Sequence, residues 1–348
     1  MSGGVDSSVA VAMLVEQGYA VFGIMLNLWS EPDSNRANRC CAPDSVAMAR
    51  QVASKLSIPF YVLDARQLFF DVVIRPFIDD YTHNRTPNPC LACNRLVRWT
   101  FLFNHALAAG ADYLATGHYT RLSRDADDIH QLSRAVDHGK DQSYVLHVLT
   151  QEKLAHALFP LGEYTKEHVR QLAQKYDLPV AERPDSQDLC FVGAGGNYRE
   201  FISRYSPQAQ RPGSIVDLQG KVLGHHPGLA YFTLGQRKGL GISSTTPLYV
   251  LEKDFDHDEL VVGPKDQLGS SQLVADNVNW IAGHPPSLSF PALVKVRYTA
   301  REVPGVVHVL DGDRFEVKFE NVVPDITPGQ AAVLYDGDIC LGGGIISN

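Results

Sequence analysis

The sequence has no surplus of basic residues. Its 31 Lys and Arg are outnumbered by 39 Asp and Glu, which gives a net charge of −8 over 348 residues. Proteins that coat nucleic acid without sequence preference depend on excess positive charge, so this balance argues against that class but allows a local basic patch. The chain also lacks an apolar run near the ~18 residues of a membrane helix, and it shows no signal peptide. We therefore expect a cytoplasmic protein without membrane association.

A Walker phosphate loop is also missing, because no Gly-Lys-Ser/Thr follows the glycine-rich segment at the start of the chain. That segment is Ser2-Gly3-Gly4-Val5-Asp6-Ser7-Ser8, and it leads into an apolar-periodic run. Glycines allow close approach to a ligand, and a helix N-terminus attracts phosphate. The segment resembles the SGGxDS loop of the pyrophosphatase-type ATP enzymes; the alternative is a tight turn before an ordinary helix. Such a loop normally follows a buried parallel strand, so we expect the reading frame to continue upstream of Met1.

Changes in the hydrophobic pattern predict the domain organisation. Over residues 1–142 apolar strands alternate with helical stretches, which predicts an α/β domain with a doubly wound parallel sheet. Residues 143–210 are mostly helical, and we expect them to form a small central helical domain. Beyond residue 211 the apolar pattern takes a period of two, with turn signals at Asp311-Gly312 and Asp336-Gly337. Residues 211–348 are therefore predicted to form a C-terminal β-barrel or a pair of barrels.

Cysteine is scarce, with six in the chain. This is too few for a disulfide scaffold and, in a reducing compartment, is typical of catalysis or metal binding. Cys90 and Cys93 follow two prolines, and we expect Cys93 to begin a helix whose dipole favours a thiolate. The pair could also be half of a structural zinc site, with Cys40-Cys41 as the other half. Cys190 stands in a polar, glycine-flanked segment typical of an active-site loop, although a lone cysteine is more often buried and structural. Cys340 is expected in the core.

Seven motifs occur together in this chain. They are the SGGVDSS loop, Thr86-Pro87-Asn88-Pro89 followed by Cys93-Asn94, Ala115–Tyr119, Gly139–Tyr144, Asp185-Ser186 followed by Cys190-Phe191, Thr233–Gly241 and Leu341–Gly344. With this combination the chain resembles the tRNA-specific 2-thiouridylases of bacteria and mitochondria over essentially its whole length, apart from a missing first strand. The resemblance implies an adenine-nucleotide alpha-hydrolase-like first domain. It also implies a sulfurtransferase that thiolates the wobble uridine of tRNA with the use of ATP.

The resemblance implies a mechanism that uses two cysteines. ATP would adenylate the 2-oxygen of the uridine and release pyrophosphate, so that AMP becomes the leaving group. Cys190 would carry the incoming sulfur as a persulfide obtained from a donor protein. Cys93 would be the nucleophile that frees this sulfur, leaving a Cys93–Cys190 disulfide. This exchange needs two thiols within bonding reach and at least one thiolate.

Binding residues are carried over one by one from the same motifs. Asp6 and the loop serines would help to hold Mg²⁺ and phosphate, and the target base would leave its stack to reach the site. The residues that match nucleotide contacts are Met1, Ser2, Gly3, Gly4, Val5, Asp6, Ser7, Ser8, Met25 and Gly117. The residues that match tRNA contacts are Asn88, Pro89, Cys90, His118, Lys140, Asp141, Gln142, Arg297, Tyr298 and Gln330.

Cys90 departs from the family pattern, because many members have an acidic residue at this position. Cys90, Cys93 and Cys190 together could therefore hold an iron–sulfur cluster with one open iron. Two other functions also remain open. One is a different ATP-dependent amidating or ligating enzyme with the same loop, which would need no reactive cysteine pair. The other is a zinc-stabilised RNA-binding protein without catalytic activity.

Overall fold

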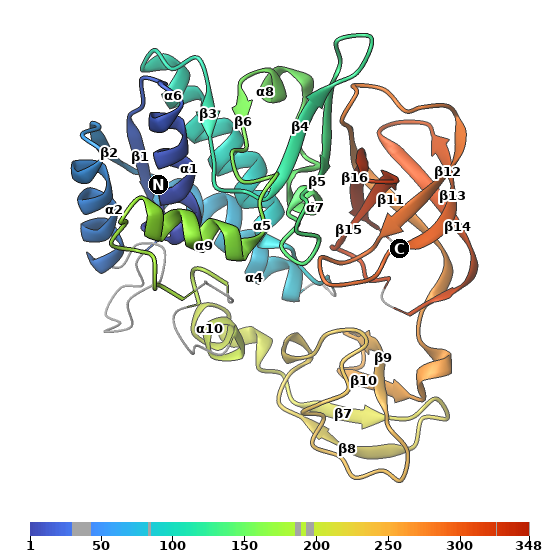
Figure 1. The fold of residues 1–348 in the computed structure, drawn as a ribbon. Coiled ribbons are helices and arrows are strands. Elements are labelled where there is room, and N and C mark those ends of the chain that lie inside the picture. Colours follow the sequence, from blue (N-terminus) through green and yellow to red (C-terminus); the bar gives the residue numbers. More distant parts are fainter. Residues whose placement is uncertain (30–42, 83–84, 185–188, 193–197, 325, 348) are drawn as a thin grey trace.

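The computed structural model describes residues 1–29, 43–82, 85–184, 189–192, 198–324 and 326–347; Cys40 and Cys41 lie outside this set. Three units follow one another along the chain: a mixed helix–strand unit, a small β-sheet and a β-barrel. In Figure 1 the small sheet (yellow) lies below the other two units. None of the described helices is long and apolar enough to cross a membrane.

The first unit contains two pairs of parallel strands. β1 (Gly23–Asn27) pairs with β2 (Phe60–Asp64), and β3 (Leu114–Ala115) pairs with β6 (Ala157–Leu158). The helices around them are α1 Val5–Glu16, α2 Pro43–Lys55, α7 Ser143–Leu146, α8 Gln151–Ala155 and α9 Lys166–Lys175. The α/β prediction for the start of the chain is therefore confirmed, although the described strands form two separate parallel pairs rather than one doubly wound sheet.

Two longer helical runs in this unit contain wide, π-helical turns, which are rare and often occur near functional sites. The first run comprises α3 Arg66–Phe69, a π-helical segment Phe70–Ile74 and α4 Arg75–Thr82. The second comprises α5 Pro89–Ala92, a π-helical segment Cys93–Leu102 and α6 Phe103–Ala108. The junctions of the second run keep right-handed helical angles, so it is one continuous helix that begins at Pro89.

The central helical domain predicted from the sequence is wrong. The middle unit is a four-stranded sheet in the order β8-β7-β10-β9, preceded by α10. The bounds are α10 Tyr198–Tyr205, β7 Gly213–Val216, β8 Val222–His226, β9 Tyr249–Asp254 and β10 Glu259–Gly263. The preceding helices instead contribute to the first unit: Val169 and Ala173 of α9 are buried in one cluster with Val9 and Ala12 of α1. Helical periodicity shows that a segment buries one face, but it does not show which unit supplies the partner.

The C-terminal unit is a barrel, as the alternating pattern predicts. Among the described residues, six strands in the order β11-β14-β13-β12-β15-β16 close through pairing of β11 with β16. Their bounds are β11 Ser270–Trp280, β12 Ser289–Lys295, β13 Val303–Leu310, β14 Arg314–Val323, β15 Ala331–Asp336 and β16 Ile339–Ile346. The hairpin of β4 (Thr120–Arg124) and β5 (His130–Arg134) extends this sheet, because β5 pairs with β16. Figure 1 shows this hairpin (green) between the first unit and the barrel, which backbone hydrogen bonds therefore join.

The glycines near the C-terminus allow strands to pack closely around β16. A Cβ added at Gly342 would lie 2.2 Å from the carbonyl oxygen of Asn279, and one at Gly344 would lie 2.8 Å from that of Asp276. Larger residues would therefore separate β16 from β11, so barrel packing accounts for these motif glycines. Cys340 is 1% exposed, which confirms its predicted place in the core.

Candidate active site

The glycine-rich segment leads directly into α1 and packs against α2. We call residues 1–8, which include the first turn of α1, the glycine loop. Gly3 has a φ of 70°, and a Cβ added there would lie 2.4 Å from the carbonyl oxygen of Ser45 in α2. Ser8 Oγ donates to the carbonyl oxygen of Gly4 at 2.8 Å. No described side chain caps α1 at Gly4. The first N–H groups of α1 can therefore bind an anion.

Three side chains from distant parts of the chain converge on this loop. Asp6 accepts hydrogen bonds from Tyr119 Oη at 2.7 Å and from Lys166 Nζ at 2.6 Å. Arg183 donates to the carbonyl oxygen of Gly3 at 2.8 Å. Sequence reasoning gave no role to Lys166 or Arg183, because neither stands in a motif and nothing local shows that they approach the loop. Together they bring two positive charges to a site suited to phosphate.

Gly117 and Met25 were both predicted to contact nucleotide, but their settings differ. A Cβ added at Gly117 would lie 2.8 Å from backbone atoms of Asp6 and Ser7, in the first turn of α1. Gly117 therefore lies directly against the glycine loop. Met25 is in β1 with its side chain 2% exposed, so that side chain belongs to the core.

His118, which was predicted to lie near the RNA, is a buried neutral histidine. Its Nδ1 atom lies 2.8 Å from Thr116 Oγ1. Burial lowers the pKa of His118 to about 3, and the positive charge of Arg98 acts in the same direction. At neutral pH this ring is therefore uncharged, and it can contact RNA by hydrogen bonding but not as a cation.

Cys93 and Cys190 belong to one large apolar cluster, although they stand far apart in the sequence. Cys93 is a buried member of this cluster, and the partly exposed Cys190 packs against it. The neighbour of Cys190, Phe191, belongs to the same cluster, with its ring centroid 5.1 Å from that of Phe77. Both cysteines are thiols in this structure. Cys190 is thus held beside the cluster that contains Cys93.

The helix that carries Cys93 begins earlier than predicted. It starts at Pro89, because proline suits the first helical position, where its missing N–H would be unsatisfied in any case. Cys93 therefore lies beyond the first turn, and the effect of a helix dipole falls off within that turn. The predicted activation of Cys93 by a helix N-terminus is wrong. The exposed thiol in the first turn is that of Cys90.

The residues predicted to contact tRNA gather where the first unit meets the barrel. Gln330 Nε2 donates to the carbonyl oxygens of Thr86 and Pro87 at 2.9 and 3.2 Å. Tyr298 Oη donates to the carbonyl oxygen of Asp141 at 3.2 Å. Barrel residues are thus bonded to two separate segments of the first unit. We call this junction the seam, and it is formed by residues 86–90, 140–144, 297–298 and 330.

Tyr144 lies inside the seam and was not singled out from the sequence. Its hydroxyl donates to the carbonyl oxygen of Ala331 at 3.0 Å and is hydrogen-bonded to the side chain of Asn88. Its ring centroid lies 5.9 Å from that of Tyr298. Burial raises the pKa of Tyr298, and the charges of Asp141 and Cys90 act in the same direction.

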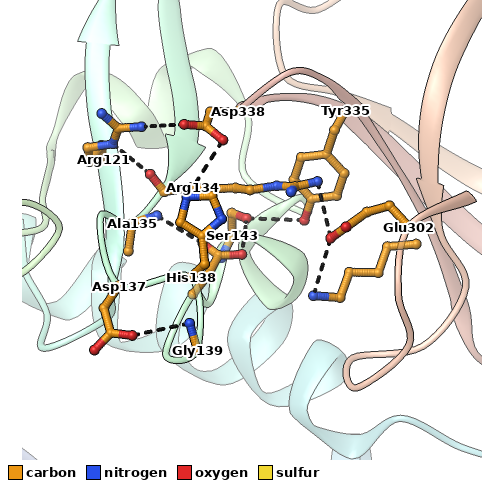
Figure 2. Close-up of polar contacts among 12 residues, drawn as sticks. Arg121, Arg134, Ala135, Asp137, His138, Gly139, Ser143, Glu302, Tyr335 and Asp338 are labelled. Atoms are coloured by element: carbon orange, nitrogen blue, oxygen red, sulfur yellow. Dashed lines mark hydrogen bonds and ion pairs between the residues drawn. The ribbon is translucent and has the colours of Figure 1, made fainter. Parts of the chain in front are cut away.

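The carboxylate of Asp141 accepts hydrogen bonds from groups within the protein. It is 6% exposed and accepts bonds from Ala135 N (3.1 Å), Ser143 N (3.2 Å) and Ser143 Oγ (2.8 Å). Figure 2 shows the continuation of this network, in which Ser143 reaches Tyr335 and Arg134 lies against the same ring. The guanidinium of Arg134 lies 4.1 Å from the ring centroid. Asp141 therefore ties the neighbouring loop to the barrel.

Two arginines strengthen the attachment of the barrel. Arg134 lies 3.3 Å from the carboxylate of Glu302, a contact drawn in Figure 2. Arg297 donates to the carbonyl oxygen of Leu234 at 3.1 Å and to the hydroxyl of Thr327. Arg297 thus connects the barrel to the motif 233–241 of the middle unit.

Within the described ranges, no group of three or more His, Cys, Asp or Glu side chains is placed to hold a metal ion. The three thiols predicted as cluster ligands, Cys90, Cys93 and Cys190, do not form such a group in this arrangement. The zinc alternative required Cys40 and Cys41, which lie outside the described residues.

Three family models match the chain in the order of its three units. The tRNA methyl transferase HUP domain matches residues 1–194, the tRNA methyl transferase PRC-barrel domain matches residues 199–264, and the Aminomethyltransferase beta-barrel domain matches residues 270–346.

Curated relatives named tRNA-specific 2-thiouridylase MnmA align with almost the whole chain. The relative from Natranaerobius thermophilus is 44% identical over 352 residues, which cover 99% of this chain and 95% of the relative. That from Magnetococcus marinus is 46% identical over 348 residues, with 99% and 97% covered. That from Geotalea uraniireducens is 46% identical over 353 residues, with 100% and 94% covered. This chain belongs to the tRNA-specific 2-thiouridylase family. Membership of this family confirms the resemblance drawn from the motifs. It favours the sulfurtransferase over the amidating enzyme and the RNA-binding protein that the residues alone left open.

Proposed function

We propose that this chain replaces the 2-oxygen of the wobble uridine of tRNA with sulfur, in a reaction that consumes ATP. The observation that carries the proposal is that Cys93 and Cys190 belong to one apolar cluster, in a chain whose glycine loop suits phosphate. A ligase that activates its substrate with ATP needs such a loop but has no use for two thiols. Sulfur transfer to an activated uridine uses both features.

The first step would take place at the glycine loop. The 2-oxygen of uridine attacks the α-phosphorus of ATP, the bond to pyrophosphate breaks, and the oxygen becomes part of an AMP leaving group. The N-terminus of α1 and the cations of Lys166 and Arg183 face the developing negative charge, which supports stabilisation of the departing pyrophosphate.

A Mg²⁺ ion fits the side chains at this loop. The carboxylate of Asp6 is 36% exposed, and the partly exposed Ser7 stands on the same turn. Ser8, which was also predicted to help hold the ion, is buried and donates its hydroxyl to Gly4. Mg²⁺ prefers oxygen ligands of this kind and commonly completes its shell with substrate phosphates. The ion would neutralise phosphate charge, and Lys166 would share the Asp6 carboxylate with it.

The second step would be thiol–disulfide exchange between the two cysteines. Cys190 carries an extra sulfur as a persulfide, and the Cys93 thiolate attacks the Sγ atom of Cys190. The persulfide S–S bond breaks and hydrosulfide leaves, while a Cys93–Cys190 disulfide forms. Hydrosulfide attacks C2 of the adenylated uridine and expels AMP. An external thiol must then reduce the disulfide before the next turnover.

The tRNA would bind along the seam. Cys90 and Cys93 are three residues apart on one helix, so they lie on the same face about one turn apart. A base held by Asn88, Pro89 and Cys90 would therefore be close to the attacking thiol. Tyr298 is 40% exposed and offers a ring on which an unstacked base can pack.

An iron–sulfur cluster does not fit the thiols in this arrangement, and the proposed reaction does not use one. The described residues place no group of three ligands around Cys90 or Cys93. The check is iron analysis of protein purified without oxygen. Background iron in an active preparation would exclude the cluster, whereas stoichiometric iron would favour it over the persulfide route.

The proposed function is tested by nucleoside mass spectrometry after incubation with unmodified tRNA, ATP, Mg²⁺ and a persulfide donor. We expect ATP-dependent 2-thiouridine from the native chain and none from Cys93→Ser or Cys190→Ser. Cys340→Ala is the matched control, because burial raises the pKa of that thiol to about 12 and makes it inert. Full product from either active-site variant would contradict the two-cysteine mechanism. The identity of the donor protein and the cytoplasmic location remain predictions.

A further inference from the structure

Asp6 of the glycine loop is connected through Tyr119 to the loop predicted to contact tRNA, which we call the 137–142 loop. Tyr119 Oη donates to Asp6 Oδ1 at 2.7 Å. The backbone of Tyr119 forms two bonds with Gln142, at the far end of the 137–142 loop. Gln142 N donates to Tyr119 O at 2.8 Å, and Tyr119 N donates to Gln142 Oε1 at 3.0 Å.

Lys166 makes a second connection between the same two loops. Its ammonium lies 2.6 Å from Asp6 Oδ1, and the lysine side chain is only 12% exposed, whereas the carboxylate is 36% exposed. The backbone N–H of Lys166 donates to Asp137 Oδ2 at 2.9 Å. The other oxygen of Asp137 accepts from Gly139 N at 3.1 Å, a bond that Figure 2 shows.

Both connections end on the same oxygen atom of the glycine loop and begin at opposite ends of the 137–142 loop. The hydroxyl of Tyr119 is the polar end of a residue that is only 3% exposed and otherwise packed among apolar side chains. Packing alone would be served equally well by phenylalanine. The hydroxyl is therefore explained by its bond to Asp6.

We infer that Tyr119 and Lys166 couple the two loops, so that bound tRNA strengthens ATP binding and bound ATP strengthens tRNA binding. This inference rests on the proposed function, because it takes ATP at the glycine loop and tRNA at the 137–142 loop. Tyr119 and Lys166 are positioning residues in this role.

The physical basis is preorganisation. A tRNA phosphate that binds Lys140 restrains the 137–142 loop, and the backbone bonds then fix Tyr119 and Lys166 around Asp6. ATP and Mg²⁺ would meet a site whose carboxylate is already oriented, so less ordering remains to be done on binding. A positive coupling between the two ligands is informative, because two polyanions without such a connection would bind independently or repel each other. Linkage requires the effect to be equal in both directions.

The experiment measures the dissociation constant of α,β-methylene-ATP with Mg²⁺, with and without saturating unmodified tRNA. The reverse titration measures tRNA with and without the analogue. For the native chain we expect each ligand to tighten the other by about fivefold or more. In Tyr119→Phe and in Lys166→Met, each tested alone, the factor by which one ligand tightens the other should fall close to one. Lys166→Arg should retain part of the coupling. Thermal melting verifies that each variant is folded.

Matched controls come from the same region. Tyr164→Phe removes a hydroxyl from a residue packed against the same apolar cluster, and Lys175→Met removes a cation of α9 that pairs with Glu16. Both should keep the native coupling factor.

A native factor near one, or full coupling in Tyr119→Phe and Lys166→Met, would overturn the inference. Thiouridine formation at saturating substrate separates the two proposals. Product without coupling leaves the proposed function standing, whereas coupling without product supports the inference and contradicts the function.

Discussion

Arg183 donates a hydrogen bond to the carbonyl oxygen of Gly3 at 2.8 Å. This bond joins the glycine loop to the stretch of chain that leads to Cys190, seven residues further on. The stretch is also anchored to α9, because Arg170 donates to the carbonyl oxygens of Ala181 and Arg183 at 3.2 and 3.3 Å. Seven residues reach at most about 25 Å, so Cys190 stays within that distance of the backbone of Arg183, whose side chain binds the glycine loop.

Gly117→Ala should weaken ATP binding without unfolding the protein. The added Cβ would lie 2.8 Å from backbone atoms of Asp6 and Ser7, so the first turn of α1 must shift. Overpacking of this kind costs about 1–3 kcal/mol, and we expect the dissociation constant of α,β-methylene-ATP to rise about tenfold or more. Calorimetric titration measures it. Gly110→Ala is the control, because it has a φ of 88° with open space around it and should lower stability without changing ATP affinity. Equal affinities for Gly117→Ala and the native chain would contradict this placement.

Lys140→Ala and Asp141→Ala, although adjacent, should have different effects. Loss of Lys140 should weaken tRNA binding and reduce the slope of log K against log salt by about one, because one phosphate contact disappears. Loss of the Asp141 carboxylate leaves the donors of Ala135 and Ser143 unsatisfied, which should cost about 2 kcal/mol or more of unfolding free energy. Filter binding across a salt series and urea unfolding measure the two effects. An Asp141→Ala protein with native stability and a reduced salt slope would show that its carboxylate serves the RNA instead.

The sequence predicted the chemistry of the site better than it predicted the hydrogen bonds that hold the site together. The glycine loop stands in a compact motif whose residue types indicate phosphate binding. The sulfur-transfer roles of Cys93 and Cys190 came from the resemblance, because their residue types alone left metal binding and a structural role open. The partners of Asp6 could not be predicted in this way, because Tyr119 lies 113 residues away and Lys166 lies 160 residues away. Only the packing of α9 against α1 brings Lys166 to the loop.

Contacts between distant residues also explain why the prediction of a central helical domain failed. The amphipathic pattern of α9 was correct, but its buried residues Val169 and Ala173 face α1 rather than a separate helical domain. Pro89 was interpreted as excluding a helix, although proline is well suited to a first helical position. The role of Asp141 depends on Tyr335 and other barrel residues that no local pattern connects to it.

Acidification should destabilise the protein through His147. Burial lowers the pKa of His147 from 6.5 to about 4, opposed in part by its bond to Tyr144. Between these values the unfolded chain binds a proton that the folded protein does not, so the free energy of unfolding falls as pH falls from 6.5 towards 4. The loss from this one group amounts to about 3 kcal/mol.

His147→Asn should flatten this pH dependence, because the amide can still donate to Tyr144 but does not titrate. Urea unfolding at several pH values measures the slope. The buried ring of His118 titrates in the same direction, so part of the slope should remain. His284→Asn, at an exposed position, is the control and should keep the native slope. The assignment fails where the two variants give the same pH dependence.

Lys253→Met should make the protein more stable. Lys253 lies in β9 and is 2% exposed, and among the described residues its Nζ atom has no hydrogen-bond partner. The ring of Phe255, with its centroid 5.5 Å from Nζ, compensates only part of the lost hydration. Methionine keeps the apolar stem and removes the buried charge. We expect the free energy of unfolding to increase by about 1–2 kcal/mol. Each kcal/mol should raise the melting temperature by about 2–4 °C.

The pH dependence identifies the cause of this gain. Burial lowers the pKa of Lys253 from 10.5 to about 8, so between these values the unfolded chain binds one proton more than the folded protein. The stability contribution of the lysine therefore rises with pH across this window, and the advantage of Lys253→Met should shrink between about pH 8 and about pH 10.5. Lys265→Met, at an exposed position just after β10, should change stability by less than about 0.5 kcal/mol at either pH. A Lys253→Met protein that is less stable than the native chain would mean that the ammonium is paired in solution. A constant advantage at both pH values would attribute the gain to packing rather than to the removed charge.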